Sequence, residues 1–125
     1  MKGIRSLVFA IGVVVAASAW GAGGHSHAPQ HGGVVTESKE ADYELVAKPD
    51  VIQLYIRHHD KTVDIKGASA KVTFLTGNEK SEVALAPAGN KLEARGSFKV
   101  GAGTKAVAVV SRSGKPVQAV RFVVK

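Results

Sequence analysis

The feature that most restricts the fold of this chain is a succession of short runs rich in β-branched and aromatic residues, each ended by turn-forming residues. Pro49-Asp50, Gly77-Asn78 and Gly89-Asn90 are among the breaks. No longer stretch outside the N-terminal region has the apolar stripe of a helix. The pattern predicts an all-β fold with about seven strands, at Tyr43–Lys48, Val51–His58, Ala70–Thr76, Ser81–Ala86, Lys91–Arg95 (with an extension through Phe98 as an alternative), Ala106–Arg112 and Val117–Val124.

Alternation within the runs supports strands with one buried face. Ile52, Leu54 and Ile56 share one side of the second run, and Tyr55 and Arg57 lie on the other. Short strands that recur roughly every 10 residues are typical of an antiparallel two-sheet sandwich of the immunoglobulin-like type. An antiparallel barrel is the main alternative.

The first residues have the anatomy of a secretory signal peptide. Lys2 and Arg5 precede an uncharged apolar stretch from Leu7 to Ala17, and small residues follow it. That stretch is shorter than the roughly 20 apolar residues that cross a bilayer. We therefore expect residues 1–19 to be removed on export, with a cut as late as residue 22 as the alternative, and no membrane span after cleavage.

Composition limits the chemistry that the mature chain could perform. The sequence has no cysteine, and its only methionine, Met1, lies in the expected signal peptide. Thiolate nucleophiles and disulfides are therefore excluded, and a transition-metal site would need imidazole and oxygen ligands. The formal net charge of +7 is interpreted as solvated strand faces, because no nucleic-acid motif or aromatic platform accompanies it.

A His- and Gly-rich stretch precedes the β-type runs. Residues 20–33 have little to bury and are predicted to form a flexible tail before a domain at 34–125. His25, His27 and His31 lie in this tail, at a spacing that lets a flexible backbone wrap three imidazoles around one ion. Neutral imidazole binds Zn(II), Cu(II) and Ni(II) well, so these three are candidate ligands. We expect the domain to fold without the tail and without metal.

Two further histidines end the second run. His58 continues the face of Ile52, Leu54 and Ile56, and is expected on the core side. His59 points the other way, beside Asp60, and is a candidate fourth metal ligand or simply half of a surface pair.

Enzyme motifs are not found in the sequence. It has no G-x-S-x-G, no H-E-x-x-H and no phosphate-binding glycine loop. Gly101-Ala102-Gly103-Thr104 is followed by no helical pattern and is interpreted as a turn. We therefore expect a protein that is not an enzyme.

Several runs together resemble known proteins. They are His31-Gly32-Gly33-Val34-Val35, Asp42-Tyr43-Glu44-Leu45-Val46, Ile52-Gln53-Leu54-Tyr55-Ile56 and Lys71-Val72-Thr73-Phe74-Leu75-Thr76-Gly77. The chain resembles small exported proteobacterial proteins with a His-rich leader, an HGG element and one β domain. More loosely, about residues 31–85 are similar to the β-rich N-terminal region of periplasmic adaptors from heavy-metal efflux systems. The chain lacks the long helical hairpin of such an adaptor.

The resemblance implies a periplasmic location and metal handling, carried over to His31 and less directly to His25 and His27. The leading hypothesis is a periplasmic accessory protein that binds or buffers a divalent transition metal and associates with an efflux component. The alternative is a periplasmic interaction module that binds protein through an exposed strand edge, with incidental histidines.

Overall fold

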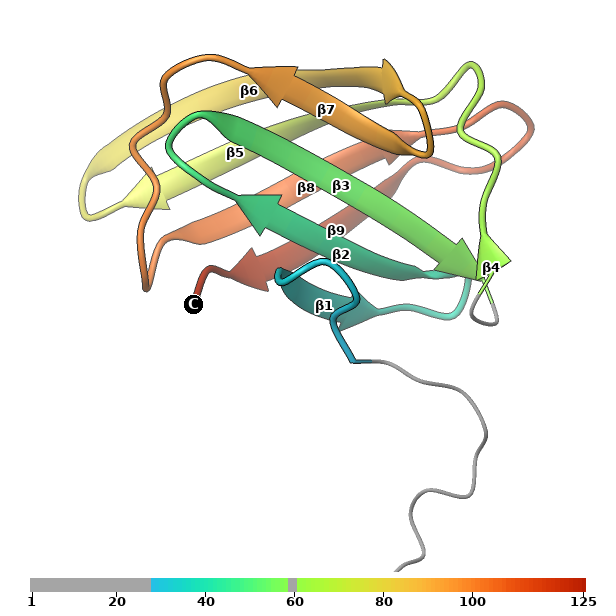
Figure 1. Cartoon of the computed structure of the whole chain (residues 1–125), viewed down its shortest axis with the longest axis horizontal. Coiled ribbons are helices and arrows are strands. Elements are labelled where there is room, and N and C mark those ends of the chain that lie inside the picture. The colour runs from blue at the N-terminus through green and yellow to red at the C-terminus, as the bar shows by residue number, and fades with distance from the viewer. Residues whose placement is uncertain (1–27, 59–60) are drawn as a thin grey trace, which may run out of the picture.

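The computed structural model describes residues 28–58 and 61–125, which form nine strands and no helix (Figure 1). No helix long and apolar enough to cross a membrane occurs in these two ranges. The strands are β1 (Val34–Glu37), β2 (Asp42–Ala47), β3 (Val51–His58), β4 (Lys61–Thr62), β5 (Ser69–Thr76), β6 (Glu79–Ala88), β7 (Lys91–Arg95), β8 (Lys105–Ser111) and β9 (Gln118–Val123).

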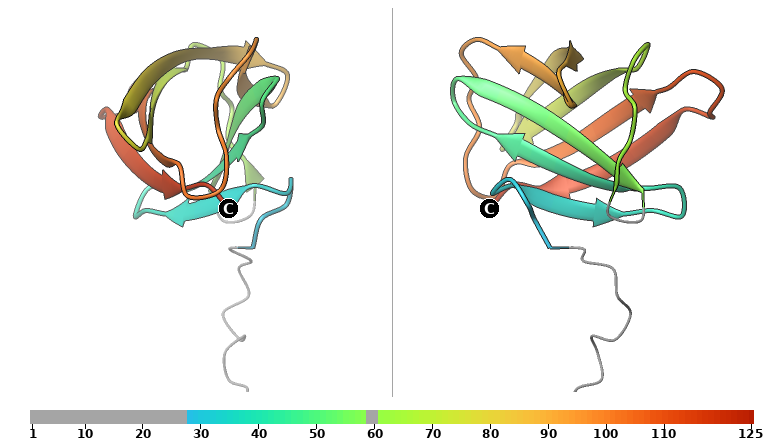
Figure 2. Two further views of the ribbon diagram at one scale, coloured as in Figure 1. Left: turned by 90° about the vertical axis from the view of Figure 1, so that its left-hand side faces the viewer. Right: turned by 45° about the vertical axis from the view of Figure 1, so that its right-hand side comes forward.

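All strand pairs are antiparallel, and the strands form one continuous sheet in the order β1-β2-β3-β7-β6-β5-β8-β9, with β4 paired to β3. Strand β6 connects the two halves of the sheet. Its residues 79–85 pair with β5, and its last residues, Ala86–Ala88, pair with β7. The sheet rolls up along this order into a nearly closed, barrel-like shape, seen end-on in Figure 2.

The core fills the inside of the roll with aliphatic and aromatic side chains from both halves. Ile52, Leu54 and Ile56 of β3 are fully buried, as the alternation of the sequence predicts. They pack in one cluster with residues of β5, such as Val72 and Phe74. Burial of this apolar surface contributes on the order of 25 cal/mol per Å² and is the main force that holds the roll together.

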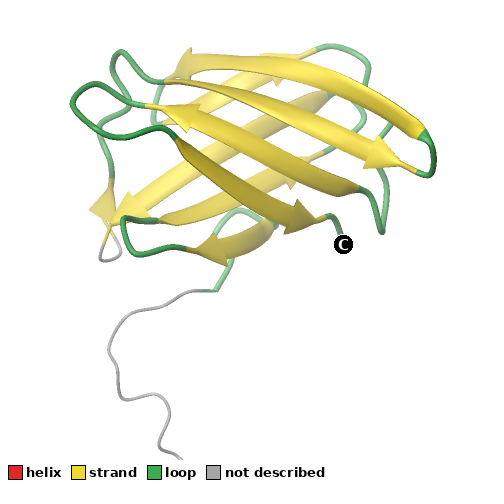
Figure 3. Ribbon diagram, turned by 180° about the vertical axis from the view of Figure 1, so that it is seen from behind, coloured by secondary structure: helices red, strands yellow, loops and turns green. Residues whose placement is uncertain are grey.

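The two ends of the strand order come back together. Strands β1 and β9 are in contact and are labelled in Figure 1; Figure 3 shows the same roll of strands from behind. Between them, the hydroxyl of Thr36 donates a hydrogen bond of 2.6 Å to the carbonyl oxygen of Arg121. No backbone ladder joins these two strands within the described residues. We call this junction of β1 and β9 the seam.

The expectation of an antiparallel all-β fold is confirmed, whereas the immunoglobulin-like sandwich is not. Two separate sheets would need no shared strand, but β6 pairs with strands of both halves. Each of the seven expected strands has a counterpart, and the predicted and observed bounds of β3 coincide. Strands β1 and β4 were not predicted, and β7 ends at Arg95 instead of continuing through Phe98.

Candidate functional site

A buried carboxylate holds the chain segment before β1 against the outside of the sheet. Glu44 lies on β2 between the inward-facing Tyr43 and Leu45, so its side chain points outward, yet it is fully buried. Its carboxylate accepts backbone N–H bonds from Gln30 (2.9 Å), His31 (2.8 Å) and Gly33 (2.9 Å). We call residues 28–33 together with Glu44 the clasp.

The hydrogen bonds of the clasp decide the ionisation of Glu44. Burial raises the pKa of this carboxyl, because removal from water disfavours the charged form. The backbone N–H groups of Gln30, Gly33 and His31, together with the positive character of the His31 ring, outweigh burial and hold its pKa below the usual value. The clasp is therefore formed around a carboxylate anion, and charge-assisted hydrogen bonds of this kind are stronger than neutral ones.

Two glycines allow the segment to approach Glu44. Gly32 has a φ of +79°, a conformation that side chains with a Cβ atom rarely adopt. At Gly33 a Cβ atom would lie 2.2 Å from the carbonyl oxygen of Leu45, so only glycine fits against β2. The HGG element is thus a structural requirement of the clasp, in addition to any role of its histidine.

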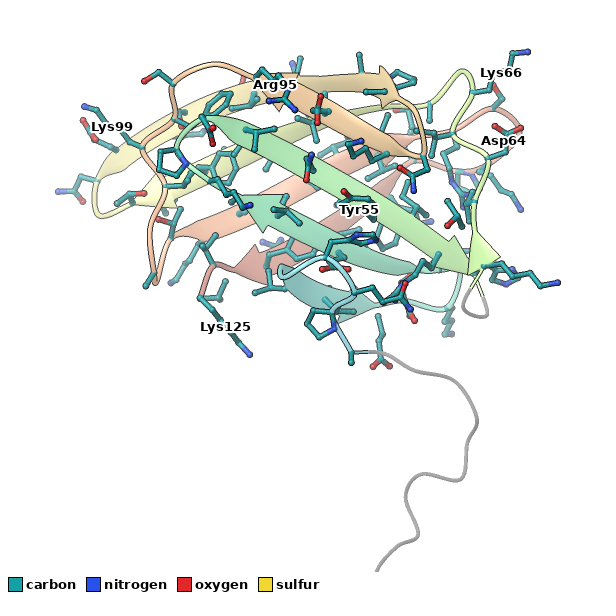
Figure 4. The ribbon with its side chains drawn as sticks, viewed as in Figure 1. Tyr55, Asp64, Lys66, Arg95, Lys99 and Lys125 are labelled. Atoms are coloured by element: carbon teal, nitrogen blue, oxygen red, sulfur yellow. The ribbon has the colours of Figure 1, made fainter. Side chains whose placement is uncertain are left out.

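The clasp places the imidazole of His31 flat on an aromatic ring. The rings of His31 and Tyr55 are stacked, with 3.6 Å between centroids and an interplanar angle of 7°. Tyr55 lies on the outer face of β3 (Figure 4), directly opposite Glu44 in the register. His31 itself is exposed. Stacking uses the face of the imidazole, so the nitrogens on its edge remain accessible to an ion.

A row of polar side chains continues from Tyr55 across the outer face to β7. The Tyr55 hydroxyl donates to Oε1 of Gln53 (3.3 Å), and Nε2 of Gln53 donates to Oε2 of Glu93 (2.7 Å). Arg95 closes the row with an ion pair of 3.2 Å to Oε1 of Glu93. The hydrogen bond from Gln53 and then the charge of Arg95 lower the pKa of Glu93. These contacts fix the ring on which His31 rests.

Arg57 is the second buried charge under the segment. It lies two residues after Tyr55 on the same outer face and is only 3% exposed. Its Nη2 donates to the carbonyl oxygen of Ala28 at 3.3 Å. Nε and Nη1 are buried and have no partner among the described residues. Arg57 thus holds the start of the segment, as Glu44 holds its end.

The structure describes one of the four predicted metal ligands. His31 is placed on the outer face of β2 and β3, whereas His25, His27 and His59 lie outside the described residues. In the described part of the chain, no group of three or more His, Asp or Glu side chains could hold an ion. His31 would therefore need partners from elsewhere in the chain.

Two expectations about this region need correction. The expected signal peptide at residues 1–19 and residues 20–27 of the expected flexible tail lie outside the described residues. In the last part of that tail, Gln30, His31 and Gly33 are held by Glu44. His58 was expected on the core side, but it is exposed, because β3 reaches the rim of the roll at its last residue. His58 therefore does not belong to the core.

Sequence reasoning missed the residues that build the clasp. Glu44 stands within the otherwise apolar run Tyr43–Val46, and a charge at the centre of such a run was the signal that could have drawn attention to it. A buried carboxylate needs donors, and the segment at the HGG element supplies the backbone N–H groups of Gln30, His31 and Gly33. Comparison of the chain with known proteins found no matching family model, no similar curated protein and no similar solved structure.

Proposed function

We propose that this protein is a non-enzymatic periplasmic protein that binds or buffers a divalent transition metal, with Zn(II), Cu(II) and Ni(II) as the candidate ions. His25, His27 and His31 are the proposed ligands, and His59 is the proposed fourth. Association with a metal-efflux component belongs to the same proposal and is supported by the resemblance of the HGG element and the following strands to efflux adaptors.

The observation that carries the proposal is the position of His31. Its backbone N–H is bound to Glu44 at 2.8 Å, and its ring is stacked on Tyr55 and exposed. A ligand that is already fixed loses less conformational freedom when it binds an ion, which improves affinity. His27 and His25 lie four and six residues before His31, a separation short enough for a chain to bring them to one ion with it.

The proposal is tested by calorimetric titration of the mature protein with each of the three ions. We expect His31→Ala to weaken binding by at least tenfold and replacement of His25, His27 and His31 together to abolish most of it. His58→Ala is the matched control, since His58 is also exposed but ends β3. Single replacements are preferable to removal of residues 1–31, which would also delete two of the three N–H donors to Glu44.

The pH dependence of binding gives a second test. Only deprotonated imidazole coordinates a metal, and the reference pKa of histidine is about 6.5. Affinity should therefore fall steeply as the pH decreases through this range. The proposal fails if the triple variant binds as tightly as the original protein. If the loss of His58 and His59 instead eliminates binding, the site lies at the end of β3.

A tyrosine signal would locate the ion. Cu(II) close to His31 should quench the fluorescence of Tyr55, because the two rings are in contact. Tyr43 is the only other tyrosine and is fully buried. Trp20 remains after a cut at residue 19, and its emission overlaps that of tyrosine, so it is replaced by Phe in every protein used for this experiment. Quenching that persists in Tyr55→Phe would place the ion away from His31.

A further inference from the structure

A groove follows the seam on the outside of the molecule. Its volume is about 540 Å³, and its lining comes from β1, β8 and β9, together with Pro29 and Lys125. Lys125, at the C-terminal end of the chain, is labelled in Figure 4 beside this region. The proposed metal ligand His31 is not part of the lining, so the inference below does not depend on metal binding.

The groove runs beside an unpaired strand edge. β9 pairs with β8 alone, and its carbonyl at Arg121 points toward β1, where it accepts the bond from Thr36. Since the N–H and C=O of one residue in a strand point to the same side, and alternate residues repeat this direction, the backbone groups of Val123 face the seam as well. The carbonyl of Arg121 is already bonded to Thr36, so an extended peptide would pair with the backbone groups of Val123, as peptides do at open sheet edges.

The lining combines aliphatic surface with positive charge. Val107 and Val123 point outward, and Val123 is 57% exposed. Their cross-strand partners in the ladder are Arg121 and Lys105 respectively, so apolar and cationic side chains alternate on this face. Lys125 adds a third cation, and the lining contains no acidic residue. The surface therefore complements a segment that carries both carboxylates and apolar side chains.

The N-terminal part of this chain does not provide such a segment. Residues 20–27, which remain after the expected cut, contain no Asp or Glu, so they offer no carboxylate to the cations of the groove. A lipid surface would be contacted best by a convex patch, whereas these cations surround a hollow of about 540 Å³.

We propose that the seam groove binds an extended acidic segment of a partner protein, in which carboxylate and aliphatic side chains follow one another at every second residue and so face the same side. The segment pairs with the backbone of β9 at Val123, beyond the contact of Thr36 with Arg121, and places its apolar side chains on Val123. Its carboxylates pair with Lys105, Arg121 and Lys125.

The test uses a fluorescein-labelled peptide of ten residues in which Glu and Val occupy every second position in turn, with Ser between them, so that both kinds of side chain face the groove. It is titrated into the full mature protein while anisotropy is measured. A second peptide of the same composition has its Glu and Val residues in two separate blocks. We expect the alternating peptide to bind at least tenfold more tightly than the block peptide. In Lys105→Glu/Arg121→Glu, its affinity should fall at least tenfold.

The matched control is Lys48→Glu/Lys66→Glu, which changes the net charge equally at two exposed lysines outside the groove. It should alter affinity by less than twofold. Amide hydrogen exchange should slow at Val123 when the alternating peptide is bound. Circular dichroism of each variant verifies that it is folded, which exposed positions should permit.

Three results would overturn the proposal: equal binding of the two peptides, equal losses in the two double variants, or no binding of either peptide. Vesicles containing phosphatidylglycerol provide the remaining comparison. If the protein binds these vesicles through Lys105 and Arg121 but does not bind the alternating peptide, the surface recognises lipid and the proposal is wrong. A further outcome is that the protein self-associates, fails to bind the peptide, and loses self-association in Lys105→Glu/Arg121→Glu. The groove would then bind a second copy of this chain, and the proposal would be wrong.

Discussion

At the scale of single residues, the molecule depends on two buried charges that the strand pattern does not explain. Glu44 and Arg57 occupy outward positions of β2 and β3, where alternation predicts solvent-exposed side chains, and both are buried by the segment before β1. Residue alternation reports which side of a strand a side chain takes. It does not report whether another part of the chain covers that side, which is why the ring position of His31 could not be predicted.

Loss of the Glu44 carboxylate should loosen the segment and destabilise the fold. Glu44→Ala leaves three N–H groups without their acceptor, and we expect a loss of about 2–3 kcal/mol in the free energy of unfolding. Glu44→Gln keeps one accepting oxygen and the side-chain shape, so the expected loss is smaller, about 1 kcal/mol. Urea denaturation followed by circular dichroism measures both. Unchanged stability in Glu44→Ala would show that the segment contributes nothing to the fold.

The same carboxylate makes stability depend on pH in a defined direction. The pKa of Glu44 is lower in the folded protein than its ordinary value of 4.5. Its contribution is therefore complete at pH values above 4.5, decreases as the pH falls below that value, and is lost at the depressed pKa of the folded state. The stability difference between the original protein and Glu44→Gln should shrink over this window. A difference that stays constant from pH 7 to about pH 3 would contradict a lowered pKa.

At the scale of elements, local sequence located most strands but not the contacts between them. The runs that became β2, β3, β5 and β8 were recognisable because each alternates and ends at turn residues. β1 has four residues and directly follows the glycines of the clasp, and β4 has only two. Neither is long enough to show alternation. Both are recognised as strands only through their pairing with β2 and β3 respectively.

The entry of the chain into β1 requires glycine at one position, and this is testable. Gly33→Ala would place a Cβ atom 2.2 Å from the carbonyl oxygen of Leu45, so the backbone would have to shift and Gly33 would lose its bond to Glu44. We expect a loss of about 2 kcal/mol or more in the free energy of unfolding.

The control for this change is Gly101→Ala. A Cβ atom at Gly101 would meet nothing within 4 Å, and this glycine has no positive φ. Its stability should therefore stay within about 0.5 kcal/mol of the original. Equal effects of the two substitutions would mean that the close approach at Gly33 does not constrain the segment.

At the scale of the whole molecule, the two halves of the roll should unfold together. β6 pairs with both β5 and β7, and the core cluster contains residues of β3 and β5 alike. The shared strand and shared core couple the halves, so we expect one cooperative transition. Native-state amide hydrogen exchange should give the same opening free energy for the slowest amides of β3 and of β5. Slowest values that differ by more than about 1 kcal/mol between these strands would indicate two independent units.

Local sequence could not distinguish two separate sheets from one rolled sheet, because the difference lies in how β6 pairs. The residues of β6 look like one ordinary strand, and nothing in their alternation shows that the first part pairs with β5 and the last part with β7. That division is set by the overall path of the chain. The antiparallel all-β class was predictable, because it needs only short strands and tight turns.

The shared strand β6 also determines where new chain termini could be introduced into this protein. New chain termini are tolerated best at exposed connections whose backbone is not part of a ladder. The turn at residues 89–90, between β6 and β7, and the loop at residues 113–116, between β8 and β9, meet that condition. A cut within β6 would instead separate the part of the strand that pairs with β5 from the part that pairs with β7, and so detach the two halves from each other. Circular permutants of this fold should therefore keep Glu79–Ala88 intact.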